Sequence, residues 1–445
     1  MKYFGTDGIR GIANAELTPD LAYRTGLAMA TALLSNAEGR CKVFIGRDTR
    51  ISGNMLECAL AAGICAAGAD VYFLGVLPTP AISYLTVKHN AQAGVVISAS
   101  HNPFEHNGIK IFGGNGFKLS DETENLIEEL IDNPPANVKT GADIGITTNF
   151  EHEGAEEYAQ HILSSVKGEI KGLKALIDCA NGASSNTAQL IFSKLGVDCT
   201  LIHNTPNGIN INENCGSTHI DKLADMVKEG GYDIGIAFDG DADRCLMVDE
   251  NGNIIDGDII MGTLAKYMKE QGVLKGGVVA TVMSNLGLHV FLKENGIDIL
   301  TTKVGDRYVL EEMIKKGYNI GGEQSGHMIV SDFATTGDGQ LTAVKVLEML
   351  SSMNAKPSAM TNSIQIYPQI MINVNVPNDI KKTVAQLPAV IEVAKEIEEV
   401  FQDKGRVLIR PSGTEAKVRV MVEGNDLEKV KMFAEKAAEA VRKSI

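Results

Sequence analysis

Three acidic residues stand at alternate positions, Asp239, Asp241 and Asp243, directly after an apolar run that ends at Phe238. Alternate side chains of an extended chain lie on the same side, and the small residues between these acids allow tight curvature. Clustered carboxylate oxygens suit a hard cation, and Mg²⁺ above all when a phosphate completes its shell. We therefore predict a Mg²⁺ site at these three carboxylates.

The acidic segment has two other interpretations. Counted from Asp239, positions 1, 3, 5 and 12 satisfy the pattern of an EF-hand calcium loop. Position 6, however, is Arg244 where that loop needs glycine, and strand-like segments flank it where helices should be. A solvated acidic turn is the other alternative, and the apolar runs on both sides disfavour it.

A hydroxyl and an imidazole are adjacent at Ser100 and His101, in a polar loop that follows another apolar run. The loop has no G-x-S-x-G elbow, and no third member of a hydrolase triad can be identified. Opposite a metal-binding loop, a serine can instead carry a phosphoryl group while the cation neutralises charge. Lys110, just downstream, could assist with proton transfer or charge. The alternative is a polar turn closed by Asn102-Pro103, with Lys110 on the solvated surface.

The segment Arg-Pro-Ser-Gly-Thr-Glu that begins at Arg410 has the composition of a phosphate-binding loop. Arg410 offers a guanidinium fork, and Gly413 lets backbone N–H groups approach an anion. Ser412 and Thr414 offer hydroxyls, and Arg419 follows in the next strand-like run. The alternative is an ordinary hairpin loop with a surface arginine.

Two further loops carry polar side chains. The glycine-rich turn over residues 5–11 presents Arg10, and residues 323–327 present Glu323 and Ser325. A carboxylate and a hydroxyl of this kind hydrogen-bond sugar hydroxyls or an amine.

An internal repeat supplies the elements that must position these loops. Short apolar runs begin at positions 42, 174 and 277, and each is followed by a polar loop and a helix-length periodic segment. The three helices end alike, at the Gly-x-Asp sequences 68–70, 196–198 and 296–298, where the glycine suits a left-handed helix end. This order predicts repeated α/β domains with mainly parallel strands.

The third apolar run of each unit leads into one of the polar loops, namely 98–103, 239–244 or 323–327. Ligands of open parallel sheets bind beyond the carboxyl ends of the strands. We therefore expect the three loops to face one central cleft.

Beyond about residue 352 the pattern changes to alternating runs at 372–376 and 418–422 with two helix-like segments, which predicts a smaller α+β domain with an antiparallel sheet. We expect four domains: 1–152 with the serine loop, 153–252 with the metal-binding loop, 253–365 with the sugar-binding loop, and 370–445 with the phosphate-binding loop. The first three are α/β domains with mixed, mainly parallel sheets.

Charge and composition exclude several classes of partner. The net charge of −15 repels polyanions, so neither nucleic acid nor an anionic membrane is expected to bind. No apolar stretch is long enough to span a membrane, and residues 55–69 are expected to form a buried core helix. The seven cysteines are an odd number without C-x-x-C spacing, as expected for reduced thiols in a cytoplasmic protein.

In combination, the loops resemble a known family. The chain is similar along essentially its whole length to the α-D-phosphohexomutases, through five motifs in family order: Gly-Thr-Asp-Gly-Ile-Arg at 5–10, Ser-Ala-Ser-His-Asn-Pro at 98–103, Asp-Gly-Asp-Ala-Asp-Arg at 239–244, Gly-Glu-Gln-Ser-Gly-His at 322–327 and Arg-Pro-Ser-Gly-Thr at 410–414. Ser98 stands where many members have threonine.

The resemblance implies a role for each loop. Ser100 would be phosphorylated, and one Mg²⁺ would be held by the phosphoserine with Asp239, Asp241 and Asp243. Proton transfer and charge compensation would come from His101, Lys110, Arg10, Arg244 and His327. Substrate would be bound by Gly305, Glu323, Ser325 and His327, and its non-reacting phosphate by Arg410, Ser412, Gly413, Thr414 and Arg419.

The implied reaction moves a phosphoryl group between two positions of a small phosphosugar, through a phosphoserine and a hexosamine 1,6-bisphosphate. The length, the motif Val-Gly-Asp-Arg-Tyr-Val at 304–309 and Gln324 are most similar to the bacterial branch acting on glucosamine 6-phosphate and glucosamine 1-phosphate, which feeds UDP-N-acetylglucosamine and cell-wall synthesis. Activity on glucose or mannose phosphates is the alternative within the family. Relatives in this branch are often dimers, so a homodimer is expected.

Two alternatives lie outside the family. The strand end at Asp239 and Asp241 resembles the D-x-D of haloacid-dehalogenase-like phosphatases, in which the first aspartate is the nucleophile. The fourth motif position of that family is usually Thr or Val, and here it is Asp243, which disfavours a phosphatase. A sugar-phosphate binding module without turnover is the non-enzymatic alternative.

Overall fold

The computed structural model describes residues 2–5, 7–34, 39–135, 138–377, 379–412 and 416–445. The chain divides into two compact units. Residues 1–283 and 297–362 form the first, and residues 284–296 and 363–445 form the second. The two units are described one at a time.

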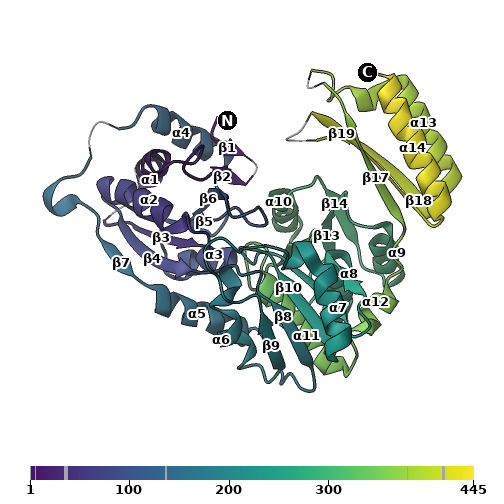
Figure 1. Cartoon of the computed structure of the whole chain (residues 1–445), viewed down its shortest axis with the longest axis horizontal. Helices are drawn as coiled ribbons and strands as arrows, with labels where there is room; N and C mark the ends of the chain where they lie inside the picture. The colour runs from purple at the N-terminus through teal and green to yellow at the C-terminus, as the bar shows by residue number, and fades with distance from the viewer. Residues whose placement is uncertain (1, 6, 35–38, 136–137, 378, 413–415) are drawn as a thin grey trace. The chain divides into compact units, whose positions relative to one another are not determined.

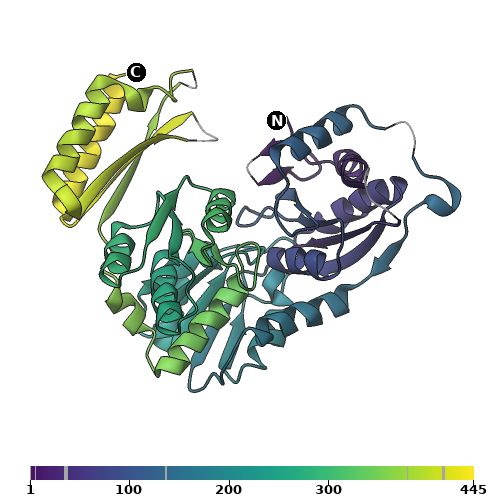
Figure 2. The same cartoon turned by 180° about the vertical axis from the view of Figure 1, so that it is seen from behind.

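The first sheet of the first unit has seven strands in the order β1-β2-β6-β5-β3-β4-β7. The strands are β1 (Phe4–Gly5), β2 (Gly8–Ile12), β3 (Lys42–Arg47), β4 (Asp70–Val76), β5 (Ala93–Ile97), β6 (His106–Gly113) and β7 (Thr147–Asn149). Helix α2 (Gly53–Ala66), with α1 (Pro19–Leu34) packed against it, covers one face (Figure 1). Helices α3 (Thr79–Lys88) and α5 (Glu151–Ser164) cover the other face. Figure 2 shows the same arrangement with the molecule turned to the opposite side. Helix α4 (Asp121–Asp132) packs on α1.

Two smaller sheets complete the first unit. One has the order β12-β11-β10-β8-β9 and the other β14-β13-β15-β16. Their strands are β8 (Lys174–Asp178), β9 (Asp198–Ile202), β10 (Ile234–Phe238), β11 (Cys245–Asp249), β12 (Ile254–Ile255), β13 (Val278–Thr281), β14 (Ile299–Thr302), β15 (Ile320–Gly322) and β16 (Met328–Val330). The accompanying helices are α6 (Ala188–Phe192), α7 (Ile220–Gly230), α8 (Gly257–Glu270), α10 (Asp306–Lys316), α11 (Gly339–Met353) and α12 (Ser358–Ser363).

The predicted repeat is confirmed. In each of the three sheets, the first strand of the repeat (β3, β8 or β13) pairs in parallel with the second and the third strand of the same repeat. A fourth strand, β6, β11 or β16, then runs antiparallel beside the third. The glycines of the three Gly-x-Asp sequences all have positive φ, at 97°, 76° and 62°. Gly68 and Gly296 directly follow a helix C-cap, where left-handed backbone ends a helix without the steric cost that a Cβ would bring, whereas α6 ends at Phe192, four residues before Gly196.

The serine, metal and sugar loops therefore occupy the same place in three copies of one motif. Each connects the third strand of its sheet to the antiparallel fourth strand. The fold class predicted from the sequence is correct in the mixed, mainly parallel character of these sheets.

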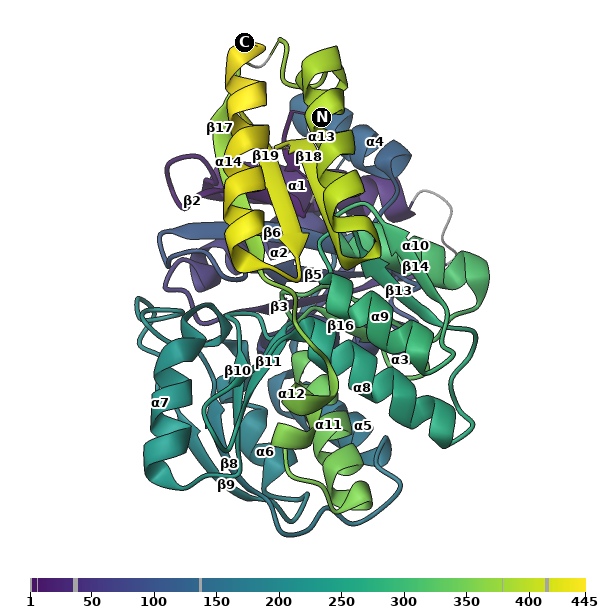
Figure 3. The same ribbon diagram turned by 90° about the vertical axis from the view of Figure 1, so that its right-hand side faces the viewer.

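The second unit contains a three-stranded antiparallel sheet in the order β17-β19-β18. Its strands are β17 (Gln369–Asn375), β18 (Gly405–Pro411) and β19 (Lys417–Gly424). Helices α13 (Pro388–Phe401) and α14 (Leu427–Lys443) lie side by side on one face of this sheet (Figure 3). The antiparallel sheet and its two helices confirm the predicted small α+β domain. Helix α9 (Leu286–Glu294), which the sequence places in the third α/β domain, groups with this unit instead.

The core follows the same division. Apolar residues of the first sheet and of α1, α2 and α4 form one large buried cluster, and the second unit has a separate cluster between its sheet and α13 and α14. The expected core helix over 55–69 is α2. Among the described residues, no helix has the length and apolar character needed to cross a membrane.

Candidate active site

The serine loop joins β5 to β6, and its first three residues, 98–100, are buried whereas His101 is exposed. Ser100 has 2% of its surface exposed and a φ of 52°, a left-handed conformation that is uncommon for a residue with a side chain. Its Oγ donates a hydrogen bond to Asp239 Oδ2 at 2.7 Å and lies 3.4 Å from His101 Nδ1. The structure thus places the predicted serine directly against the predicted metal-binding loop.

A buried arginine, which the sequence analysis missed, holds this loop. The guanidinium of Arg50 donates to the backbone carbonyls of Ser100, Asn102 and Pro103 and pairs with Asp48 at 2.8 Å. Both side chains of the Arg50–Asp48 pair are fully buried. Asp48 also accepts a bond from Ser98 Oγ at 2.6 Å. The five donors of a guanidinium can serve three carbonyls and Asp48 at once, whereas the three donors of a lysine cannot.

The three aspartates form a compact cluster of oxygen atoms. One carboxylate oxygen of each residue lies within 4.8 Å of one oxygen of the other two, and all three residues are buried. Asp241 Oδ1 and Asp243 Oδ1 are buried and accept no hydrogen bond from any residue that the structure describes. Buried charged oxygens without donors are costly unless a cation compensates them. The donor set therefore fits a hard divalent cation such as Mg²⁺.

The electrostatics of the cluster lead to the same conclusion. Burial, together with the charges of Asp243 and Asp241, raises the pKa of Asp239 well above its usual value. A bound dication would favour ionisation of Asp239, because opposite charge favours the charged form.

Lys110 projects from β6 into the same cluster. Its Nζ lies 2.8 Å from Asp241 Oδ2, 3.2 Å from Asp7 Oδ2 and 4.0 Å from Asp243 Oδ2. Burial opposes a charged amine, but Asp241 and Asp7 outweigh it and raise the pKa of Lys110. Lys110 is consequently held as a cation, which suits charge compensation better than proton abstraction.

His101 has the opposite character. Burial and the guanidinium of Arg244 lower its pKa, so the ring is neutral near pH 7. Arg244 NH1 lies 3.4 Å from His101 Nδ1, and Arg244 Nε lies 3.8 Å from Asp243 Oδ1. A neutral imidazole beside the serine can accept and return a proton.

The sugar loop brings a carboxylate and an imidazole to the same region. Glu323 Oε1 accepts a hydrogen bond from the backbone N–H of Gly305 at 3.1 Å. His327 Nδ1 lies 3.6 Å from Asp243 Oδ2, while its Nε2 accepts from the Gly337 N–H at 3.1 Å.

His327 is under two opposing influences. Burial disfavours a charged ring, but nearby carboxylates, Asp243 foremost, outweigh burial and raise the pKa of His327 to about 9. The Gly337 contact opposes full protonation, because a protonated Nε2 has no lone pair to accept it. In either state Nδ1 carries a proton that faces Asp243.

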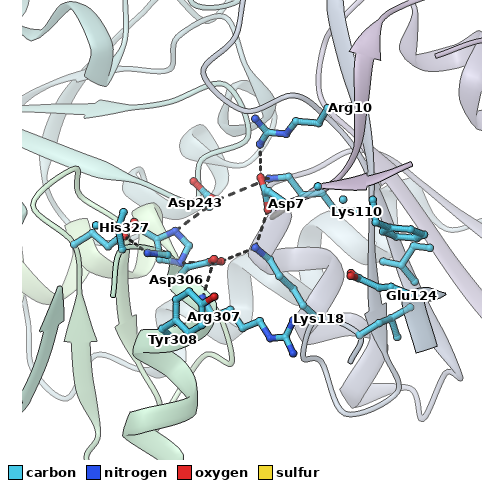
Figure 4. Close-up of a pocket in the computed structure, with 18 of the residues that line it drawn as sticks. Asp7, Arg10, Lys110, Lys118, Glu124, Asp243, Asp306, Arg307, Tyr308 and His327 are labelled. Carbon is cyan, nitrogen blue, oxygen red and sulfur yellow. Dashed lines mark hydrogen bonds and ion pairs between the residues drawn. The ribbon is translucent and has the colours of Figure 1, made fainter. Parts of the chain in front are cut away.

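One pocket of about 810 Å³ gathers most of these groups (Figure 4). Eight residues singled out from the sequence line it: Arg10, His101, Lys110, Asp243, Arg244, Gly305, Glu323 and His327. Ser100, Asp239 and Asp241 are buried beside this wall and are linked to it by hydrogen bonds. Ser325 is exposed and is not among the lining residues.

The pocket also contains a charged network that the sequence analysis did not identify. Lys118 Nζ lies 2.7 Å from Asp7 Oδ1 and 2.7 Å from Asp306 Oδ2, and Asp7 pairs with Arg10 (Figure 4). Burial opposes ionisation of Asp7, but Lys110, Lys118 and Arg10 outweigh it and keep its pKa well below the usual value. The network ties the glycine-rich turn to the start of α10. The two pairs made by Lys118 join residues that are distant in the sequence, so no local pattern signals them.

The predicted phosphate loop lies in the second unit. Arg410 on β18 is directly opposite Arg419 on β19, and the pKa of Arg410 is lowered by burial and by the charge of Arg419. Like charges opposite each other are unfavourable, and an anion between them would relieve the repulsion. Ser412 is buried beside them, whereas Gly413 and Thr414 lie outside the described residues.

Comparison with known proteins explains the arrangement. Four models of the phosphoglucomutase/phosphomannomutase family match the chain: α/β/α domain I over residues 1–137, α/β/α domain II over 156–252, α/β/α domain III over 256–367 and the C-terminal domain over 371–440. The chain belongs to this family. Phosphoglucomutase/phosphomannomutase proteins are phosphosugar mutases, so the chain is an enzyme that transfers a phosphoryl group within its substrate.

Individual relatives agree with this assignment. The chain is 51% identical over 436 residues to the phosphoglucosamine mutase of Acetivibrio thermocellus. The aligned residues cover 97% of each protein. It shares its fold with a phosphoglucomutase/phosphomannomutase family protein from Burkholderia thailandensis, with a TM-score of 0.82, 24% identity and coverage of 99% of this chain and 97% of that one. The N-acetylphosphoglucosamine mutase of Aspergillus fumigatus, solved with GlcNAc-6P and magnesium, has a TM-score of 0.66 at 19% identity over 99% of this chain and 96% of that one.

Proposed function

We propose that this enzyme interconverts glucosamine 6-phosphate and glucosamine 1-phosphate through a phosphoserine at Ser100 and glucosamine 1,6-bisphosphate. The observation that carries the proposal is the position of the Ser100 hydroxyl, 2.7 Å from a buried carboxylate cluster that fits a hard cation. The relative named phosphoglucosamine mutase, at 51% identity over 436 residues, favours an amino sugar over glucose or mannose. The product would serve reactions that build UDP-N-acetylglucosamine.

In the first step, the sugar hydroxyl at C1 attacks the phosphorus of phosphoserine 100. The bond from phosphorus to Ser100 Oγ breaks as the bond to the sugar oxygen forms. The hydroxyl proton passes to His101, which is neutral, and then to Oγ across the 3.4 Å that separates Nδ1 from Oγ. The intermediate then turns over, and Oγ takes the phosphoryl group from C6 by the same steps in reverse.

The chain's charged groups stabilise the transfer. Asp239, Asp241 and Asp243, together with the phosphoserine, would hold Mg²⁺, which supplies positive charge beside the transferring oxygens. Lys110, Arg10 and Arg244 add fixed positive charge on the pocket side. Glu323, with Gly305, Ser325 and His327, would bind the sugar. The non-reacting phosphate would be bound by Arg410, Ser412, Gly413, Thr414 and Arg419.

We propose the same four-domain division as the sequence predicts, at 1–152, 153–252, 253–365 and 370–445. The four family matches, over 1–137, 156–252, 256–367 and 371–440, support boundaries near these positions.

A homodimer in the cytoplasm is the proposed state of the enzyme. Sedimentation equilibrium tests the dimer directly, and a mass equal to a single chain would reject it.

Side-by-side turnover of glucosamine 6-phosphate, glucose 6-phosphate and mannose 6-phosphate tests the substrate. We expect the highest kcat/KM for glucosamine 6-phosphate, and no mutase activity on any of the three for Ser100→Ala. A higher kcat/KM for glucose or mannose phosphate would reject the amino-sugar assignment and leave the phosphoserine mechanism standing. Release of inorganic phosphate in place of the isomeric sugar phosphate would reject the mutase reaction itself.

A further inference from the structure

A second cluster of metal-ligating side chains lies in the sheet that carries the metal-binding loop. Asp178 ends β8, His203 follows β9, and Cys215 lies at the end of the loop over residues 203–216. One donor atom of each residue lies within 4.8 Å of the other two. Asp178 and Cys215 are buried, and the side chain of His203 is 38% exposed.

The donor types differ from those of the catalytic cluster. A thiol, an imidazole and a carboxylate are ligands of Zn²⁺ and other borderline or soft divalent ions, whereas Mg²⁺ prefers oxygen alone. We propose that Asp178, His203 and Cys215 form a second cation site, selective for a soft divalent metal such as Zn²⁺. The exposed side of His203 provides a route for the ion, and water can complete a tetrahedral shell from that side.

The local hydrogen bonds orient the ligands. Asp178 Oδ1 accepts from the Ala180 N–H and Oδ2 from the Gly216 N–H, both at 2.8 Å. His203 Nδ1 lies 3.0 Å from Asp178 Oδ2. Backbone donors to a ligating carboxylate, and ligands held close together before the ion arrives, are features of built metal sites.

A Cys-His-Asp triad for nucleophilic catalysis is the main alternative for the same three residues. A catalytic thiol must be accessible and have a lowered pKa. Cys215 has 1% of its surface exposed, and burial raises its pKa to about 12. The thiol is therefore unsuited to attack a substrate. A metal ion would displace the thiol proton to solvent, so binding should release protons.

The cluster also bears on the serine loop. The Asn181 N–H donates to the His203 carbonyl at 2.6 Å, and the Asn212 N–H donates to the Ala180 carbonyl at 2.9 Å. The side chain of Asn212 then donates to the Ser100 carbonyl at 2.9 Å. An ion at this site would consequently stiffen the loop over residues 203–216, which supports Ser100.

Cobalt(II) provides the test, because a Co²⁺–thiolate bond gives a near-ultraviolet charge-transfer band that oxygen ligands do not give. The full-length enzyme is stripped of metal, saturated with Mg²⁺ and titrated with Co²⁺. We expect one Co²⁺ per chain with this band, displacement of Co²⁺ by one equivalent of Zn²⁺, and a higher thermal midpoint with Zn²⁺ bound.

Variants assign the band to the cluster. Cys215→Ser should abolish it, and His203→Gln should weaken Co²⁺ binding by more than the roughly 10–100-fold loss that removal of a supporting residue causes. Cys58→Ser, which changes an exposed thiol, and Cys199→Ser, on β9 of the same sheet, should bind Co²⁺ as the unchanged enzyme does. The absence of the band, or its persistence in Cys215→Ser, would overturn the proposal. If Cys215→Ser does not fold, the Co²⁺ affinity of His203→Gln tests the proposal in its place. An affinity equal to that of the unchanged enzyme would overturn the proposed site.

Discussion

At the scale of single residues, the site depends on charges that are buried together. The three aspartates, Ser100 and His101 were identified from residue type and spacing, because each follows an apolar run that marks a strand end. Arg50 and Asp48 were not identified, although they are near in sequence, because their function depends on carbonyl groups about fifty residues away. Buried ion pairs of this kind are specified by tertiary contacts alone.

The carboxylate cluster predicts how Mg²⁺ affects stability. Mg²⁺ should raise the thermal midpoint of the enzyme, by the equivalent of about 2.7 kcal/mol at 100 times its Kd. Asp243→Asn should lose most of this gain, because it removes one of the three carboxylates that would hold the ion. Asp225→Asn, an exposed acid in the same part of the chain, is the matched control. Retention of the full Mg²⁺ gain in Asp243→Asn would contradict the assigned site.

Arg50 should act through the position of the serine loop. Arg50→Lys keeps a charge for Asp48 but cannot bind three carbonyls as well, so Ser100 should shift. We expect kcat to fall about 100-fold, the effect of a displacement of about 1 Å in a reacting group, with little change in KM. Arg47→Lys, which changes a neighbouring paired arginine, is the control, and circular dichroism checks folding. An unchanged kcat in a folded Arg50→Lys variant would show that the serine loop keeps its position without the Arg50 guanidinium.

At the scale of elements, the repeat was the most predictable feature. The Gly-x-Asp sequences and the three apolar runs predict the succession of strands and helices along the chain and the parallel sense of the first three strands, but not the order of the strands within each sheet. The antiparallel fourth strands and the β1–β2 hairpin at the edge of the first sheet were not predicted, because their pairing depends on contacts between distant segments. The charged network of Asp7, Lys118 and Asp306 was missed for the same reason.

Close packing of α1 on α2 is a second property of the elements. A Cβ added at Gly63 would lie 2.0 Å from the Tyr23 carbonyl oxygen and 2.7 Å from the Leu27 nitrogen, both in α1. Gly63→Ala should therefore force the helices apart and destabilise the protein by about 2–3 kcal/mol, the upper part of the usual range for overpacking. For a protein of this size, with an unfolding entropy of about 2.1 cal/mol/K per residue, this corresponds to a fall of roughly 2–4 °C in thermal midpoint. Ala62→Ser, one position away and exposed, should leave the midpoint nearly unchanged.

At the scale of the whole molecule, a net charge of −15 coexists with a site for phosphorylated sugars. The net negative charge repels polyanions, whereas Arg10, Lys110, Lys118 and Arg244 line one pocket, in which acidic side chains also lie. Three copies of one strand-loop-strand motif bring their loops to that pocket, so duplication of a simple unit accounts for the convergence of serine, metal and sugar groups. A single small phosphosugar can enter where a nucleic acid is excluded.

Phosphopeptide mapping by mass spectrometry, after incubation of the enzyme with a hexose 1,6-bisphosphate and Mg²⁺, tests the central claim most directly. We predict one phosphoryl group per chain, on the peptide that contains Ser100, and its loss when a hexose monophosphate is added in excess, since the monophosphate accepts the group and becomes the bisphosphate. Ser100→Ala should take up none and should have no mutase activity. Phosphate on Asp239 or on another residue, or full activity in Ser100→Ala, would contradict the account.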